Sequence, residues 1–292
     1  MDTPARRLRQ SVKTKGLAHV MAAHSPLSAK LVEEAGFDAI WASGFELSAL
    51  YGLPDVSLVT MTQHLDMVRA MVGSCNLPIV ADVDTGFGNA INVLNTVREY
   101  ERAGVAALVM EDKTFPKVTS LVADGRQELV RLEEFQGKLD AARSVRADPD
   151  LLLIARTEAL IAGLGNEEAL RRARAYEEAG ADMVLVHSKQ KTPDEIEAFV
   201  RAWDGTAPIV LVPTAYPEMN QERIQALGGK VGLVIYGNHA IRAAVGAMQK
   251  IFATIQADGG IHRADREIAS VEEIFRLQGM DCVKANEKRY LR

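Results

Sequence analysis

The sequence has little cysteine, no long apolar segment and no excess of positive charge. Its two cysteines, Cys75 and Cys282, lie far apart without metal-ligand spacing, which argues against a disulfide framework or a zinc site. This cysteine usage fits a reducing compartment. The N-terminus lacks the apolar stretch of a secretory signal, and no apolar run approaches the length of a membrane span. We therefore expect a soluble, cytoplasmic protein that does not bind membranes.

Charge and length narrow the possibilities further. The formal net charge of -5 argues against nucleic acid as a partner. Hydrophobic residues make up 48% of the 292 residues, which is enough for a large interior. Chains of this length routinely form one α/β barrel around a single core.

Eight short apolar segments recur along the chain. They are residues 17–21, 39–42, 78–83, 107–110, 151–155, 183–186, 208–212 and 231–236. Their apolar residues are continuous rather than alternating, which is typical of parallel strands that are covered on both faces. The segments between them have helical character.

A glycine precedes several of these strands at a similar position. Gly36, Gly104 and Gly180 each follow a helical segment, and the pair at 228–229 is a looser copy. Glycine adopts the left-handed conformation that ends a helix. The repeated helix-glycine-strand unit predicts a single (β/α)₈ barrel of the TIM type over residues 1–292, with 240–292 as a helical C-terminal extension. A doubly wound sheet is the competing architecture, but it gives no reason for eight strands.

Two aspartates lie at the C-terminal end of the third predicted strand. An alternating strand would point Asp82 and Asp84 to the same side, and Gly86 and Gly88 in the next loop let backbone approach a ligand. Glu111 ends the fourth strand in the same way. Carboxylates gathered at one sheet edge suit a hard cation such as Mg²⁺. The alternative is that the two aspartates are turn or helix-cap residues.

Barrel enzymes carry their chemistry at the C-terminal ends of the strands. Arg156 ends the fifth predicted strand, His187 follows the sixth, and Asp55 lies in the loop region after the second. Each of these residues alone could belong to a structural ion pair. Together with the carboxylates on one rim, they indicate a metal site and an anionic substrate that bridges the metal and Arg156.

Several motifs, in this order, resemble the phosphoenolpyruvate mutase/isocitrate lyase superfamily. They are residues 40–44, 82–89, 111–113, 155–159, 186–189 and 270–278. The resemblance extends from about Leu17 to Tyr290. It implies the barrel, a Mg²⁺ cofactor for which Mn²⁺ or Co²⁺ could substitute, and exchange of the last helix between neighbouring barrels in a homotetramer. The alternative is that these helices pack on their own barrel.

The loop after the fourth strand separates the activities within this superfamily. Isocitrate and methylisocitrate lyases share a loop whose cysteine serves as an acid, whereas residues 113–121 of this chain contain no cysteine. The Phe-Pro-Lys-x-x-Ser-Leu form of this segment instead resembles enzymes that act on phosphonopyruvate. Where this chain has Thr119, the mutases carry asparagine and the enzymes that hydrolyse phosphonopyruvate carry threonine.

The resemblance thus implies hydrolysis of the carbon–phosphorus bond of phosphonopyruvate, through a metal-stabilised enolate, to pyruvate and phosphate. Isomerisation to phosphoenolpyruvate, hydrolysis of oxaloacetate and a catalytically silent barrel are the alternatives.

The resemblance also implies roles for individual residues. Asp82, Asp84 and Glu111 would hold Mg²⁺, directly or through water, and Asp55 would belong to the outer shell. The backbone around the second strand's end would bind the substrate's carboxylate and enolate oxygen. The substrate-binding residues there are Trp41, Ser43, Gly44 and Phe45.

The remaining roles concern the phosphonate. Arg156 would bind it bidentately, and His187 would donate to it or shuttle a proton near neutral pH. Thr119 would attack phosphorus or orient the attacking water. Lys117 would bring positive charge when residues 114–125 close as a lid. The alternatives are an ordinary polar loop threonine and a solvated surface lysine.

Overall fold

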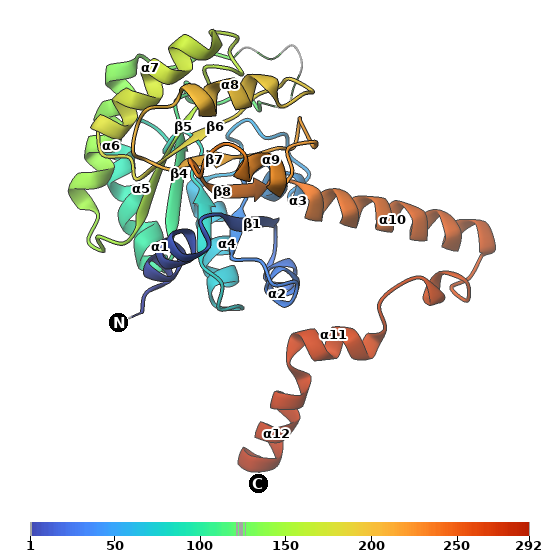
Figure 1. Ribbon diagram of the computed structural model, residues 1–292. Coiled ribbons are helices and arrows are strands. Elements are labelled where there is room, and N and C mark those ends of the chain that lie inside the picture. The colour runs from blue at the N-terminus through green and yellow to red at the C-terminus, as the bar shows by residue number, and fades with distance from the viewer. Residues whose placement is uncertain (1, 121, 123–124, 126, 292) are drawn as a thin grey trace. The chain divides into compact units, whose positions relative to one another are not determined.

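The structure is a computed structural model that describes residues 2–120, 122, 125 and 127–291. Eight parallel strands form a closed barrel in chain order, in which β8 pairs with β1 (Figure 1). The strands are β1 (Ala18–Ala23), β2 (Ala39–Ala42), β3 (Ile79–Asp82), β4 (Ala107–Glu111), β5 (Leu152–Thr157), β6 (Met183–Val186), β7 (Ile209–Leu211) and β8 (Val231–Tyr236). The predicted strands and the barrel are confirmed, and the doubly wound sheet is excluded.

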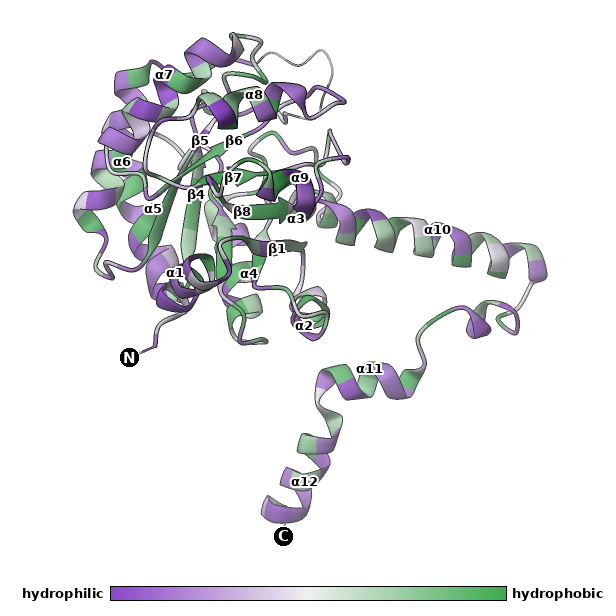
Figure 2. Cartoon of the chain, viewed as in Figure 1, coloured by the Kyte–Doolittle hydropathy of each residue, from purple (hydrophilic) through white to green (hydrophobic). Residues whose placement is uncertain are grey.

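One helix precedes β1, and the other helices of the barrel connect successive strands. They are α1 (Pro4–Lys15), α2 (Pro26–Glu34), α3 (Gly44–Leu50), α4 (Met61–Val72), α5 (Ala90–Ala103), α6 (Leu132–Val145), α7 (Gly165–Glu178), α8 (Asp194–Ala202) and α9 (Gln221–Gln225). Gly36, Gly104 and Gly180 have φ values of 80°, 87° and 95°, the left-handed conformation predicted for them. Helices α5, α6 and α7 lie side by side outside the barrel (Figure 1). The strands are apolar and the helices are amphipathic, and this pattern accounts for the packing of helices on the barrel (Figure 2).

Alternate residues of the strands fill the barrel interior. The residues of this buried cluster include Val80, Val109, Ile154 and Leu185. Because side chains alternate along a strand, the next inward position lies two residues further, at the mouth of the barrel. These next positions are Asp82, Glu111, Arg156 and His187. The alternation that builds the core therefore also brings four polar side chains to one end of it.

Residues Ala240–Arg292 form a compact unit apart from Met1–His239. The helices after β8 are α10 (His239–Asp258), a short 3₁₀ turn at Ala264–Arg266, α11 (Val271–Gln278) and α12 (Met280–Tyr290). C-terminal helices are therefore present as predicted, whereas their exchange between subunits stays a prediction. Within the described part of the chain, no helix is long and apolar enough to cross a membrane.

Candidate active site

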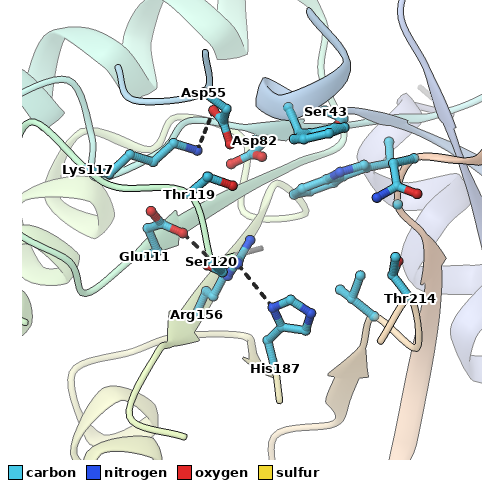
Figure 3. A pocket seen from close by; sticks show the side chains of 15 residues that line it. Ser43, Asp55, Asp82, Glu111, Lys117, Thr119, Ser120, Arg156, His187 and Thr214 are labelled. Atoms are coloured by element: carbon cyan, nitrogen blue, oxygen red, sulfur yellow. Dashed lines mark hydrogen bonds and ion pairs between the residues drawn. The ribbon is translucent and has the colours of Figure 1, made fainter. Parts of the chain in front are cut away.

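A pocket of about 530 Å³, counting its mouth, lies at the C-terminal ends of the strands (Figure 3). Its walls are formed by Trp41, Ser43, Phe45, Asp55, Asp82, Glu111, Lys117, Thr119, Ser120, Arg156, His187, Val212, Thr214, Gly237 and Asn238. The structure thus brings the predicted site residues together around one cavity, except that Gly44 and Asp84 lie beside the lining rather than in it. Ser120, Thr214 and Asn238 belong to the pocket but were not among the predicted site residues.

Asp82 and Asp84 point to the same place, but strand alternation is not the reason. Strand β3 ends at Asp82, and Asp84 has a left-handed φ of 50°. A turn places Asp84 instead, closed by a 2.8 Å hydrogen bond from the Gly86 N–H to the Val83 carbonyl. The sequence-based explanation of the second aspartate was therefore wrong, although both carboxylates lie at the site.

Gly44 contacts both of these carboxylates. Its N–H donates to Asp82 Oδ2 at 3.1 Å. A Cβ atom at this position would lie 3.0 Å from Asp84 Oδ1 and 3.3 Å from Asp82 Oδ2, so any larger residue would crowd both. The Gly44 N–H is thus engaged by a carboxylate in this structure rather than presented to a substrate anion.

Four carboxylates, those of Asp55, Asp82, Asp84 and Glu111, are buried near one ammonium group. Lys117 Nζ lies 3.0 Å from Asp55 Oδ1 and 2.5 Å from Asp84 Oδ1. Lys117 is only 5% exposed, which excludes a solvated surface lysine. Burial, only partly offset by Lys117, raises the pKa of Asp84 to about 7. Burial also raises the pKa of Glu111, against the charges of Lys113 and Arg156. The cluster therefore lacks compensating positive charge.

Arg156 and His187 form a second part of the wall (Figure 3). Arg156 Nε lies 3.4 Å from Glu111 Oε2 and donates to Glu158 Oε1, while Nη2 donates to Ser120 Oγ at 3.0 Å and faces His187 Nδ1 at 3.5 Å. Because a guanidinium cannot accept a hydrogen bond, this network assigns the proton of the neutral imidazole to Nε2. Burial, followed by the Arg156 charge, lowers the pKa of His187 to about 4. This favours a neutral donor over the predicted proton shuttle.

Sequence reasoning missed a buried network behind Arg156. Ser120 Oγ donates to Glu158 Oε2 at 2.5 Å and accepts from Lys113 Nζ at 2.6 Å. Lys113 and Glu158 are 2% and 0% exposed, and their charged atoms are 3.1 Å apart. Both residues stand just after a buried strand, and a charged residue at such a position was the signal that could have found them.

The loop after β4 holds Thr119 at the pocket. The Lys117 N–H donates to Ser57 Oγ at 3.1 Å, and Gln127 Nε2 donates to the Thr119 carbonyl at 3.1 Å. Part of the predicted lid, at positions 121, 123 and 124, lies outside the described residues. Lid closure therefore stays a prediction.

The acidic cluster fits a divalent cation in charge and in ligand type. Among the described residues of this site, five carboxylates face three cations, an excess of two negative charges when every carboxyl group is ionised. The carboxylates are Asp55, Asp82, Asp84, Glu111 and Glu158, and the cations are Lys113, Lys117 and Arg156. Glu111 Oε1 is buried and has no hydrogen-bond partner in the described part of the chain. No group of three or more acidic, histidine or cysteine side chains there is spaced to hold a metal ion alone, so water ligands would complete the set.

Comparison with known proteins identifies the family. Residues 8–256 match the family described as phosphoenolpyruvate phosphomutase. The chain is 59% identical to phosphonopyruvate hydrolase from Variovorax sp. (strain Pal2), over 99% of this chain and 100% of the relative. It is 43% identical to phosphoenolpyruvate phosphomutase from Tetrahymena pyriformis, over 98% and 94% of the two chains. A crystal structure of phosphonopyruvate hydrolase with oxalate and Mg²⁺ is 57% identical, with a TM-score of 0.93 over 99% of this chain and 100% of that one. The chain therefore belongs to the phosphoenolpyruvate phosphomutase family, within the phosphoenolpyruvate mutase/isocitrate lyase superfamily.

Proposed function

We propose that this chain hydrolyses the carbon–phosphorus bond of phosphonopyruvate to pyruvate and phosphate and requires a divalent metal ion, Mg²⁺ by preference. The observation that carries the proposal is Thr119, a hydroxyl residue in the pocket wall at the loop position where the superfamily's mutases carry asparagine. The 59% identity to a phosphonopyruvate hydrolase supports the same reaction. Isomerisation to phosphoenolpyruvate is the second candidate, because a mutase is 43% identical.

The phosphonate binds to the wall formed by Arg156 and His187. Glu111 and Glu158 hold Arg156 Nε, so the Nη edge of the guanidinium is the one that takes up phosphonate oxygens. Charge-assisted hydrogen bonds of this kind are stronger than neutral ones. His187 Nε2 is buried and has no partner among the described residues, and it donates to the same group.

Cleavage needs an acceptor for the electron pair of the broken bond. That acceptor is the substrate's ketone, which becomes an enolate. A Mg²⁺ ion held by Asp82, Asp84 and Glu111, directly or through water and with Asp55 further out, would supply Lewis-acid polarisation of the ketone. Water provides the new oxygen on phosphorus, and protonation of the enolate carbon yields pyruvate.

Thr119 is held between two residues that are tied to the barrel. Its neighbour Ser120 bonds to Glu158 and Arg156, and Lys117 pairs with aspartates on the other side. These contacts fix the Thr119 backbone, which is the preorganisation that a nucleophile or a water-orienting group needs. Both roles of the hydroxyl stay open.

The test is the product formed by Thr119 variants, followed by ³¹P NMR. Thr119→Ala should lower phosphate release at least roughly 100-fold, since a positioned hydroxyl contributes about that much. Oxalate should still bind with near-normal affinity. Thr119→Ser should keep part of the rate, and residual turnover of Thr119→Asn should shift towards phosphoenolpyruvate. Thr114→Ala, on the same loop, is the control. Phosphate release by Thr119→Ala at the parent rate would refute the role given to Thr119, and phosphoenolpyruvate as the parent's product would refute the hydrolase proposal.

The C-terminal helices are proposed to exchange between barrels in a homotetramer. Large apolar side chains on α10 and α11 are exposed in the single chain, among them Met248, Phe252 and Phe275. Exposed apolar surface of this kind is typical of protein contacts. Sedimentation of the full chain distinguishes a tetramer from a monomer.

A further inference from the structure

A buried lysine outside the pocket binds the turn that carries Asp84. Lys138 lies on α6 and is 2% exposed, and its Nζ donates to the Thr85 carbonyl at 2.8 Å. Burial lowers the pKa of Lys138 although Glu134 opposes this effect, and the hydrogen bond of the ammonium group goes to an uncharged carbonyl. The proposed chemistry makes no use of this amine.

An ammonium group in this position lowers the stability of the fold. Taking a charge out of water is unfavourable unless an opposite charge and several hydrogen bonds compensate. A methionine of similar length would occupy the same space without that penalty. A residue that lowers stability in this way commonly serves function.

The turn next to Lys138 needs support. Asp84 has a φ of 50°, which is unfavourable for a residue with a Cβ atom. Two successive carbonyl groups of the turn are held from outside. The Asp84 carbonyl accepts from the Glu111 N–H at 2.8 Å, and the Thr85 carbonyl accepts from Lys138. One donor comes from β4 and the other from α6.

We propose that Lys138 is a positioning residue that keeps Asp84 in its metal-binding conformation. Without the ammonium group, the buried Thr85 carbonyl loses its donor and the turn relaxes towards an ordinary φ. The Asp84 carboxylate then moves away from Asp82 and Gly44. The inference rests on the proposed metal site and adds a residue to it that lies outside the pocket.

The experiment is titration with Mn²⁺, followed through the electron paramagnetic resonance signal of the free ion. Removing a residue that orients a metal ligand typically weakens metal binding about 10- to 100-fold, and Lys138→Met should do the same. Lys138→Gln, which keeps a shorter and neutral donor, should weaken binding as well.

Lys230→Met is the matched control. Lys230 Nζ also donates to backbone carbonyls, those of Val200, Arg201 and Trp203, at 3.1, 2.9 and 2.6 Å. It precedes β8 and therefore lies at the opposite end of the barrel from the pocket. Its replacement should leave Mn²⁺ affinity unchanged.

Thermal unfolding in EDTA separates positioning from a general loss of stability. Lys138→Met should unfold at or above the parent temperature without metal, yet gain less on addition of Mn²⁺. Parent-like Mn²⁺ affinity in either folded Lys138 variant would overturn this inference but not the proposed metal site. A parent chain that binds no Mn²⁺ would overturn the proposed metal site and this inference with it.

Discussion

The Glu158 carboxylate is the central acceptor of the network that orients Arg156, and Glu158→Gln should disrupt it with little change of shape. Glu158 is fully buried, accepts hydrogen bonds from Arg156 and Ser120, and lies 3.1 Å from Lys113 Nζ. The amide keeps one acceptor oxygen but turns an NH₂ group towards a cation. Two charge-assisted hydrogen bonds are then lost, at about 1.5–3 kcal/mol each. This agrees with the roughly 3–5 kcal/mol that breaking a buried ion pair costs.

Urea denaturation measures this loss directly. The free energy of unfolding should fall by roughly 3–5 kcal/mol in Glu158→Gln. Turnover of phosphonopyruvate should fall about 100-fold, because a small displacement of Arg156 misplaces the substrate.

The matched control for this variant is Glu99→Gln. Glu99 also binds two cations, Arg69 at 3.2 Å and Arg102 at 2.7 Å, but its side chain is 28% exposed on α5. Surface pairs contribute at most about 1 kcal/mol, so the control should lose no more than that. An equally small loss in Glu158→Gln would refute the reasoning.

Two further predictions concern the metal and His187. Chelation should abolish turnover and Mg²⁺ or Mn²⁺ should restore it, and Asp82→Ala should lose far more activity than Asp55→Ala; turnover that survives exhaustive chelation, or equal losses in the two variants, would contradict the assigned ligands. Burial lowers the pKa of His187 to about 4 in the folded chain, whereas an unfolded histidine has a pKa of about 6.5. Between these pH values the unfolded chain binds a proton at this position and the folded chain does not. Stability is therefore lost as the pH falls from 6.5 towards 4. Between pH 7 and pH 5, His187→Gln should lose about 2 kcal/mol less unfolding free energy than the parent in urea denaturation, and identical losses would contradict the low pKa.

The barrel could be predicted because its signals are local. Continuous apolar runs mark buried parallel strands, and glycines such as Gly104 mark the helix ends between them. The placement of Asp82, Glu111 and Arg156 then follows from strand periodicity, since each lies two residues beyond an inward-facing core residue. Most of the pocket's predicted residues come from such strand ends and from the loops that follow them.

The remaining parts of the site depend on contacts between distant segments. The position of Asp84 comes from a turn with a left-handed φ, which is uncommon even for aspartate and which the neighbouring residues do not require. Ser120 bonds to Glu158, 38 residues away, and Lys138 bonds to Thr85, 53 residues away. Neither of these two contacts can be predicted from the neighbouring sequence, because a loop serine or a helical lysine is ordinarily exposed.

The acidic cluster shows why these distant contacts matter to the chemistry. Burial raises the pKa of Asp84 to about 7, so the fold holds this carboxylate in place against an electrostatic penalty. An unrestrained turn would relieve that penalty by moving Asp84 towards water. The hydrogen bonds to the Asp84 and Thr85 carbonyls resist this movement, and Lys117 offsets only part of the charge. A cation bound at the proposed metal site would meet ligands that are already positioned, and its charge would remove the repulsion between them. Stability in the absence of metal is thus reduced by the same arrangement that favours metal binding.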